Sequence, residues 1–498
     1  MERDRNTDPP AIYSGANPRR RDVLRCAGWI AAFMAFPRVP EMAAEDVSPL
    51  TAKLSAYMSA AANRPLPDEV TEKTKQHILD TFAAMISGSQ LAPGRAAINF
   101  AHNYGGEKIA TVVCSTQLCG AIEAALANGV LAHSDETDDA HGASGSHPGA
   151  AVIPAALAAG EQFSIDGVRF LRAVALGYDI GPRVVAALGG SALQGEGHRS
   201  THSIAGIFGA AAAAACVMGL NAQQMRWLLD YTAQQCSGIA AWQRDTQHIE
   251  KGFVYGGMPA RGGVTSALLV QSGWTGVDDV FSGADNFLQA EALRASPESL
   301  ADRLGERYEV TQTDIKKWTV GAPIQAPLDA LENLLKRQSF NADQVRQVTV
   351  RIAASAAKVV NNREMPDICL QHMAAVMLLD RTVSFQAAHD TARMKDPEVL
   401  KLRAKVELIG DTELEKVMPR REAIVEITLA DGAKLAEHVV AVRGSVANPM
   451  SREEVVAKAR DLIAPVLSAA TAASLTDKIF ALDNVKDIRD LRPLLQRV

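Results

Sequence analysis

The chain lacks an excess of positive charge and is poor in aromatic residues. It carries 51 lysines and arginines against 57 aspartates and glutamates in 498 residues, a formal net charge of −6. That balance excludes a generally basic nucleic-acid binder, because no cationic excess is left to neutralise phosphates. Aromatic residues make up only 5%, whereas hydrophobic residues reach 47% and charged residues 22%. This composition excludes a mostly disordered chain, and the abundance of alanine, the strongest helix former, favours helices.

Long hydrophobic runs and cysteine pairs are missing as well. No stretch reaches the roughly 18–20 consecutive apolar residues that a membrane span needs, so we expect no membrane interaction. The cysteines form no C-x-x-C pair, and we interpret them as small buried apolar side chains rather than as zinc ligands or a disulfide framework. They are Cys26, Cys114, Cys119, Cys216, Cys236 and Cys369.

Three common catalytic motifs are also absent. The sequence has no G-x-S-x-G nucleophile elbow, no Walker A loop and no G-x-G-x-x-G after a strand. Serine hydrolysis, phosphoryl transfer and hydride transfer therefore lack their usual signatures.

The first 45 residues resemble an export signal. The basic run 19–25 contains a twin arginine, and it precedes an apolar stretch over 27–36 and small residues near 41–45. This order is typical of a twin-arginine signal and would place the protein in the periplasm. The alternative is a basic, disordered leader ahead of a misassigned start codon, in which case the protein stays in the cytoplasm.

The remaining pattern predicts a mainly α protein with an inserted α+β part. Apolar residues at helical spacing indicate helices over 68–86, 120–133, 147–162, 204–218 and 221–236. Strands are expected over 344–353, 404–408, 422–429 and 433–442, with a helix over 367–380. Segments 46–283 and 449–498 would form an all-helical domain, and 284–448 a smaller α+β lid domain.

The densest group of functional side chains lies between two predicted helices. Four carboxylates and three imidazoles fall within residues 133–147, ending at His147-Pro148. The residue types suit a metal site or acid/base chemistry, in which a histidine or carboxylate moves a substrate proton. A solvated acidic loop or a helix N-cap remains the alternative. The mixture of imidazoles with carboxylates favours a site.

Four further groups contain residues that could bind or react. A basic group that includes Arg199 and His202 precedes an alanine-rich helix, a place that suits an anion. Lys251 and Tyr255 lie four residues apart, so one helical turn would bring them together. The third group is the stretch 316–325, which has a tryptophan among glycine and proline. The fourth is His372 inside an apolar helix, where a histidine is usually a core residue with its hydrogen bonds satisfied.

Taken in order, these groups resemble the MmgE/PrpD family. The matching stretches run from residue 125 to 380, and the resemblance covers about 48–465. They are 125–129 before His133, 136–139 with His141, His147-Pro148, His202 before the alanine-rich helix with Gly219-Leu220, 261–264, 316–318 through 329–330, and 378–380. The resemblance implies a helical domain with an inserted lid, a homodimer, and cofactor-free and metal-free chemistry on a small polycarboxylate.

The chain departs from the family pattern at several positions. Ala140 stands where family members commonly have a threonine, Cys216 where they have a helix lysine, and Tyr255 where they have a histidine. The stretch 318–325 stands in place of a Tyr-Pro-Cys-Cys-Arg-x-x-His stretch. These losses argue against a tricarboxylate such as methylcitrate or cis-aconitate. An epimerase, or a lyase acting on another acid, stays open.

The resemblance and the residue types together give a candidate site. We expect His147, His202, Lys251 and Tyr255 to handle protons. The expected substrate-binding residues are Glu136, Asp138, Asp139, His141, Arg199, Arg261, Lys316, Trp318, Gln325 and His372. The leading hypothesis is a lyase or isomerase that abstracts a proton next to a carboxylate. The alternative is a catalytically inactive organic-acid binding protein of the same fold.

Overall fold

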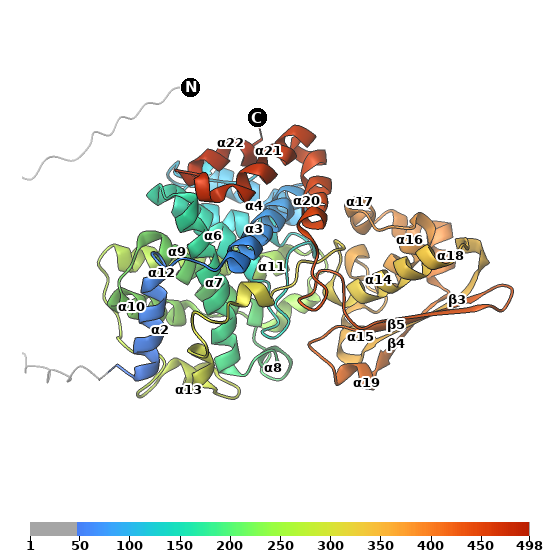
Figure 1. Cartoon of the computed structure of the whole chain (residues 1–498), viewed down its shortest axis with the longest axis horizontal. Coiled ribbons are helices and arrows are strands. Elements are labelled where there is room, and N and C mark those ends of the chain that lie inside the picture. Colours follow the sequence, from blue (N-terminus) through green and yellow to red (C-terminus); the bar gives the residue numbers. More distant parts are fainter. Residues whose placement is uncertain (1–46, 498) are drawn as a thin grey trace, which may run out of the picture. The chain divides into compact units, whose positions relative to one another are not determined.

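The computed structural model describes residues 47–497, and the predicted leader over 1–45 lies outside them. Two hydrophobic cores organise the described residues, one in a helical domain and one in an inserted α+β domain. Figure 1 shows the helical domain in blue, green and red, with the inserted domain in yellow and orange.

The helical domain is built from both ends of the described chain. Its elements are α2 (Pro49–Ala60), α3 (Asp68–Gly88), α4 (Ala92–Tyr104), the short strands β1 (Ala110–Thr111) and β2 (Leu118–Cys119), α5 (Ala121–Ala132), α6 (Pro148–Phe163), α7 (Gly167–Leu188), α8 (Ala192–Gly195), α9 (Thr201–Met218), α10 (Ala222–Gln235), α11 (Ile249–Gly252), α12 (Met258–Gln271), α13 (Phe287–Glu291), α20 (Arg452–Leu467), α21 (Ala469–Phe480) and α22 (Arg492–Leu495). The predicted helices are confirmed, and α20 packs against α3 to join the two ends of the chain.

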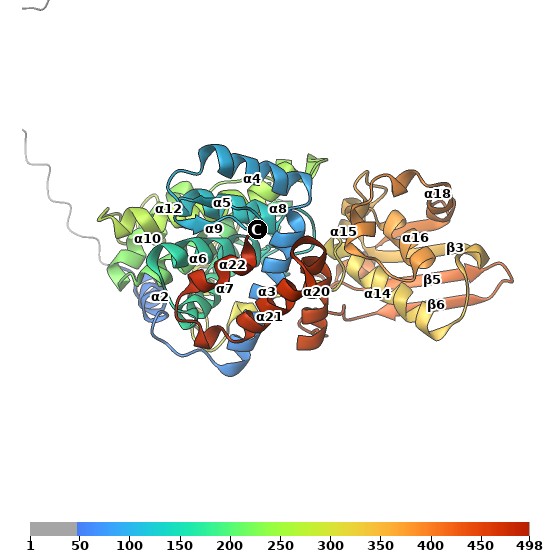
Figure 2. The ribbon, with the colours of Figure 1, turned by 90° about the horizontal axis from the view of Figure 1, so that it is seen from above.

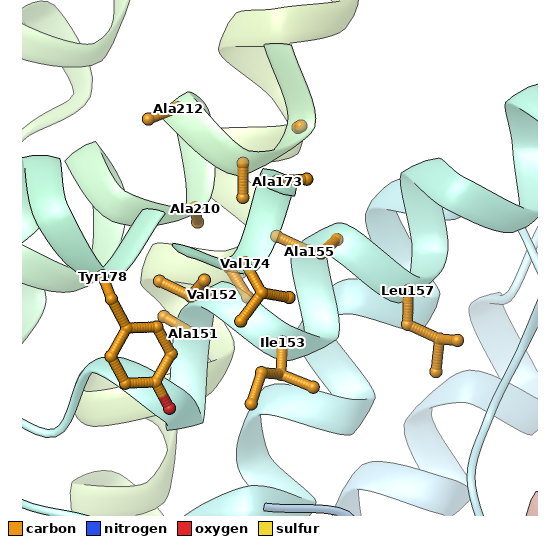
Figure 3. Packing of buried hydrophobic residues seen from close by; sticks show 14 of the residues in the cluster. Ala151, Val152, Ile153, Ala155, Leu157, Ala173, Val174, Tyr178, Ala210 and Ala212 are labelled. Carbon is orange, nitrogen blue, oxygen red and sulfur yellow. The ribbon is translucent and has the colours of Figure 1, made fainter. Parts of the chain in front are cut away.

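Helix α9 is the centre of this domain. It packs against α6, α7 and α12, and almost all of its side chains are alanine, glycine or another small or apolar residue. Figure 3 shows alanines and valines of α6 and α7 and alanines of α9 among the residues that fill this core. The helix is long and apolar enough to span a membrane, but 94% of it is buried inside the protein. Its hydrophobicity is therefore accounted for by its place in the core.

Several predicted helix ends are confirmed in detail. Gly219 ends α9 in the left-handed conformation, with φ of 72°. Asn221 caps α10 through a capping box with Gln224, and Ser451 caps α20 through another with Glu454. These local signals fixed the helix boundaries because they satisfy backbone groups that the helix itself leaves unpaired.

The inserted domain places helices against one four-stranded sheet. Its elements are α14 (Ala322–Arg337), β3 (Val345–Ala353), α15 (Ala354–Val360), α16 (Leu370–Asp380), α17 (Phe385–His389), α18 (Pro397–Arg403), β4 (Val406–Asp411), α19 (Thr412–Glu415), β5 (Ala423–Leu429) and β6 (Lys434–Val439). The strand order is β4-β3-β5-β6, with β3 and β4 parallel and the other pairs antiparallel. Figure 2 shows α14 and α16 beside the sheet, in agreement with their contacts.

The inserted core begins later in the chain than the sequence indicated. The sequence placed the start at residue 284, where the helical pattern ends. Phe287, Leu300 and Val310 nevertheless pack into the core of the helical domain, and the second core starts at Trp318. Irregular segments with isolated apolar residues give no periodicity that would reveal which core they join.

A test of the close packing uses two glycines. At Gly181, in α7, an added Cβ would collide with the backbone carbonyl of Ala205 in α9, whereas at Gly195, in α8, it would meet nothing within 4 Å. We expect Gly181→Ala to lower the free energy of unfolding by about 1–3 kcal/mol, because a backbone neighbour cannot give way. Urea unfolding should show no such loss for Gly195→Ala. Equal midpoints for the two variants would contradict this packing.

Candidate active site

The loop that joins α5 to α6 is buried rather than solvated. Glu136 is 4% exposed and Asp138 is fully buried, and Asp135 and Asp139 are buried as well. The interpretation of this stretch as a solvated acidic loop is therefore wrong. Because buried carboxylates are costly without partners, the structure has to supply cations or donors to each of them.

Two lysines neutralise Glu136 and Asp138. The ammonium of Lys251, from α11, forms an ion pair with Glu136. Lys316 Nζ donates to the backbone oxygen of Glu136 at 2.8 Å and lies 3.7 Å from its carboxylate and 3.5 Å from Asp138 Oδ1. Burial alone would raise the pKa of Glu136, but Lys251 and Lys316 outweigh it and hold that pKa well below its usual value. The negative charges of Glu136 and Asp138 are thus balanced by the positive charges of Lys251 and Lys316.

Asp138 also orients two imidazoles. Its Oδ2 lies 2.9 Å from Nδ1 of His133, and its Oδ1 lies 3.2 Å from Nδ1 of His147. Burial opposes ionisation of Asp138, yet the neighbouring histidines and Lys316 keep its pKa well below the usual range. Since an ionised carboxylate only accepts hydrogen bonds, Nδ1 of each histidine carries the proton when the ring is neutral. Nε2 of each ring is then left as a free proton acceptor.

The aromatic ring of Tyr255 lies between two of the histidines. Its centroid is 3.6 Å from that of His202 and 4.3 Å from that of His133, with nearly parallel planes. Trp242 meets the Tyr255 ring edge-on at 4.8 Å, and Lys251 Nζ lies 5.2 Å from its centroid. The expectation that Lys251 and Tyr255 come together is thus met in the structure. The contact forms on α11 and the π-helical turn Phe253–Gly257 that follows it.

A close backbone contact positions that turn. An added Cβ at Gly256 would collide with the carbonyl of Gly129 in α5, and one at Gly129 would collide with Gly256. The two glycines therefore let the turn approach α5 at the point where α5 leads into the acidic loop.

Burial keeps three of the imidazoles neutral. It lowers the pKa of His202 and His248 well below the usual value, and neighbouring cationic groups lower both further. It also lowers the pKa of His133, against the opposing effect of Asp138. Nε2 of His133, Nε2 of His248 and Nδ1 of His202 are buried without a hydrogen-bond partner among residues 47–497. Neutral, unpartnered imidazoles at neutral pH are suited to accept a proton.

The inserted domain adds two titratable side chains to the cluster. His389, at the end of α17, lies 2.9 Å from Asp135 through Nε2 and bonds the carbonyl of Phe385 through Nδ1. Burial would lower the pKa of His389, but Asp135 raises it to about 9. Asp367, in the turn Pro366–Ile368, is buried beside it, and burial raises its pKa to about 7 although His389 opposes the shift. A carboxyl with that pKa can deliver or take a proton near neutral pH.

The structure thus brings together half of the residues expected from the sequence. We call the described residues gathered around Asp138 and Tyr255 the histidine cluster. They are His133, Glu136, Asp138, His147, His202, Trp242, His248, Lys251, Tyr255 and Lys316. His133 and Asp135 lie in the group 133–147, and His248 lies just before Lys251, but none of the three was expected in the site. Trp242, Asp367 and His389 were not identified, because no motif marks them.

Four expected binding residues of the helical domain lie outside the cluster. Asp139 accepts hydrogen bonds from Tyr178 at 2.5 Å and from Gly149, and it lies 3.0 Å from His77. Arg199 pairs with Glu291, and Arg261 is exposed on α12. His141 contacts Ser144 and Glu309 at the edge of a separate cavity.

The expected residues of the inserted domain lie in its core instead. Trp318 Nε1 donates to Asp329 at 2.9 Å, and the Gln325 side chain bonds the backbone of Trp318 and Val320. His372 is fully buried in α16, where burial lowers its pKa to about 4. These contacts form part of the second core, so the stretch 318–325 serves the fold of the inserted domain.

Two overlapping groups have the donor types of a metal site. Either His133, Asp138 and His147 or His133, Glu136 and His248 place one ligand atom each within 4.8 Å of one another. The carboxylates of both groups, however, already face the ammonium groups of Lys251 and Lys316. A divalent cation would have to displace these ammonium groups, which would leave two buried lysines without their carboxylate partners. The expectation that the protein uses no metal stays a prediction.

Comparison with known proteins agrees with this arrangement. Residues 52–298 match the model of the MmgE/PrpD N-terminal domain, and residues 318–482 match that of the MmgE/PrpD C-terminal domain. The chain belongs to the MmgE/PrpD family. The division between the two matches falls where the second hydrophobic core begins, near Trp318.

Relatives with named activities span nearly the whole chain. A cis-aconitate decarboxylase of Aspergillus terreus is 25% identical over 480 residues, covering 90% of this chain and 96% of the relative. A cis-aconitate decarboxylase-like protein of Aspergillus oryzae is 24% identical over 474 residues, covering 90% and 97%. The Homo sapiens cis-aconitate decarboxylase is 25% identical, covering 86% and 91%. These relatives support a lyase-type enzyme of organic acids and do not select one reaction.

The contact between His389 and Asp135 makes stability depend on pH. Because the pKa of His389 rises from 6.5 to about 9 on folding, its contribution is complete below pH 6.5 and is lost as the pH rises through 9. We expect His389→Gln to lower the free energy of unfolding by about 1–3 kcal/mol at pH 6 and by far less at pH 10.

Urea unfolding at the two pH values checks this expectation. The matched control is His438→Gln, which removes a more exposed histidine paired with Glu422. Its effect should stay below about 1 kcal/mol. A loss for His389→Gln that is the same at both pH values would contradict the assigned pairing.

Proposed function

We propose that the protein is a cofactor-free lyase or isomerase that removes a proton next to a carboxylate of a small polycarboxylic acid. The observation that carries the proposal is the pairing of His147 with Asp138 beside two lysines. A carboxylate that holds Nδ1–H of an imidazole leaves Nε2 ready to act as a general base. The lysines supply positive charge where an enolate would develop.

Tyr255 is suited to the complementary role of proton donor. Burial raises the pKa of its hydroxyl well above the usual value, and the charges on Glu136 and Asp138 raise it further. The phenol therefore stays protonated at neutral pH. The ring centroids of His147 and Tyr255 lie 5.4 Å apart, so a base and an acid in one closed site allow proton removal and proton return.

The outcome of the reaction depends on what leaves after proton transfer. An enolate next to a carboxylate can expel a hydroxide on the neighbouring carbon, which gives a dehydration, or be reprotonated on the other face, which gives an epimer. Decarboxylation releases CO2 from a carboxylate and requires a proton to be placed on the carbanion that remains. The names of the relatives favour this last outcome, and the same acid and base residues serve all three.

The departures from the family pattern do not weaken the cluster. Cys216 is 14 residues beyond His202 in the same helix, which puts it about 21 Å further along the axis. Trp318 and Gln325 hold the inserted core together. The inactive binding protein remains the second hypothesis, and one experiment separates the two.

That experiment follows deuterium uptake by proton NMR. The full-length protein is incubated in D2O with succinate, citrate, tricarballylate and cis-aconitate in turn. Exchange at a carbon next to a carboxylate, or a new product, is the expected result. Line broadening for one acid without exchange or product would overturn the proposal in favour of the binding protein.

His147 gives the sharpest variant for this measurement. We expect His147→Gln to lower the exchange or turnover rate at least about 100-fold, because general-base catalysis contributes 10²–10⁴. His198→Gln, an exposed histidine before α9, is the matched control and should stay within about twofold of the unaltered protein. If both variants retain full rates, His147 does not carry the proton.

A further inference from the structure

A cavity borders the loop that joins α5 to α6 at His141. Its volume is about 590 Å³, within the range of small-molecule sites. Both domains line it, and the polar side chains that matter here are His141, Arg183, Arg307, Glu309, Asp314 and Arg421. Since Glu136, Asp138 and His141 belong to one buried loop, the cavity and the histidine cluster border the same segment.

Most of the charges around the cavity are already paired. Arg183 Nε lies 3.1 Å from Asp179, and Arg307 lies 2.8 Å from Glu309. Glu309 also contacts His141 at 3.3 Å. Asp314 accepts a hydrogen bond from the backbone of Val446 at 2.9 Å. Each cation among these groups thus has a charged partner, whereas Asp314 has only this backbone bond and the nearby charge of Arg421.

Arg421 is the exception. Its half-buried guanidinium forms no hydrogen bond and no ion pair with any of residues 47–497. The neighbouring Arg420, by contrast, lies 2.6 Å from Glu422 and is largely exposed. A partly buried cation without a partner costs free energy, and five N–H donors in a planar fork are suited to a carboxylate.

Arg421 is within electrostatic reach of the cluster. Burial lowers the pKa of its guanidinium, and the charges on Asp314 and Glu136 oppose that shift. Glu136 is the residue that Lys251 and Lys316 neutralise. Because the charges of the cluster balance internally, a substrate with two or three carboxylates needs a further cation nearby.

We propose that this cavity binds a carboxylate of a small aliphatic organic acid through Arg421. This inference rests on the proposed function for the identity of the acid, and it adds a residue that determines substrate specificity. Arg421 takes the place of Arg199 and Arg261 as the carboxylate anchor, since the first is paired and the second is exposed away from the cluster. A bidentate pair with Arg421 would hold one carboxylate of the acid in the cavity.

The test measures binding and turnover separately. Isothermal titration of the full-length protein uses tricarballylate, succinate and, as an uncharged probe, succinamide. We expect tricarballylate to bind, succinamide not to bind, and Arg421→Gln to weaken tricarballylate binding at least about tenfold, the loss of a charge-assisted bond. Arg420→Gln, to which we assign no role in binding, should change the affinity less than twofold.

Folding and turnover of the variants complete the design. Arg421→Gln should unfold no earlier than the unaltered protein, because it removes an unpaired buried cation. With any acid that is turned over, it should raise KM while kcat stays within about threefold. Unchanged tricarballylate binding in Arg421→Gln, or binding of succinamide as tight as that of succinate, would overturn the inference.

The failure of this inference can be told from the failure of the proposed function. If His147→Gln binds tricarballylate normally but catalyses no exchange, the proposed function holds whatever Arg421→Gln does. If Arg421→Gln loses binding while His147→Gln exchanges at the full rate, the cavity is an acid site and the assigned base is wrong.

Discussion

The mutual neutralisation of Glu136, Asp138, Lys251 and Lys316 is the interaction on which the site depends. Burying any one of these four charges alone would cost too much free energy. In contact they neutralise one another and leave the surrounding imidazoles neutral. That neutrality matters because a protonated histidine cannot act as a base. The same pairing holds the segment that leads into the inserted core against the loop of the helical domain, since Lys316 lies just before that core and Glu136 lies in the loop.

Close packing of small residues makes this charge arrangement possible. Glycines and alanines bring α9 against α6 and α7, and the contact of Gly129 with Gly256 brings the Tyr255 turn against α5. As a result, His202 and Tyr255 stack with ring centroids 3.6 Å apart, and the ring of His147 lies 5.2 Å from that of His202, although the three residues come from separate elements. Larger side chains on α9 would move the proton-handling groups apart before they altered any of the ion pairs.

The local features of this fold could be read from the sequence, whereas the long-range ones could not. Alternation predicted β3, the Asp431-Gly432 turn signal predicted β6 as a hairpin partner, and caps such as Asn221 and Ser451 marked helix starts, because these signals act over a few residues. The start of the inserted domain was misplaced, because Phe287 and Val310 join the first core without any periodicity. At the site, His147, Lys251 and Glu136 could be found as clustered reactive residues. Asp367, His389 and Arg421 are isolated in the sequence, and only folding places them beside the loop.

The central claim is that buried imidazoles in this cluster are neutral and available as bases at physiological pH. NMR of the full-length protein with ¹⁵N-labelled histidine rings tests it directly, because ring nitrogen shifts distinguish the neutral tautomers from the charged form. His202→Gln and His248→Gln assign the two signals. The account predicts that both rings are neutral at pH 6, since burial and neighbouring cations depress their pKa values. Charged rings for His202 and His248 at pH 6.5 or above would contradict it.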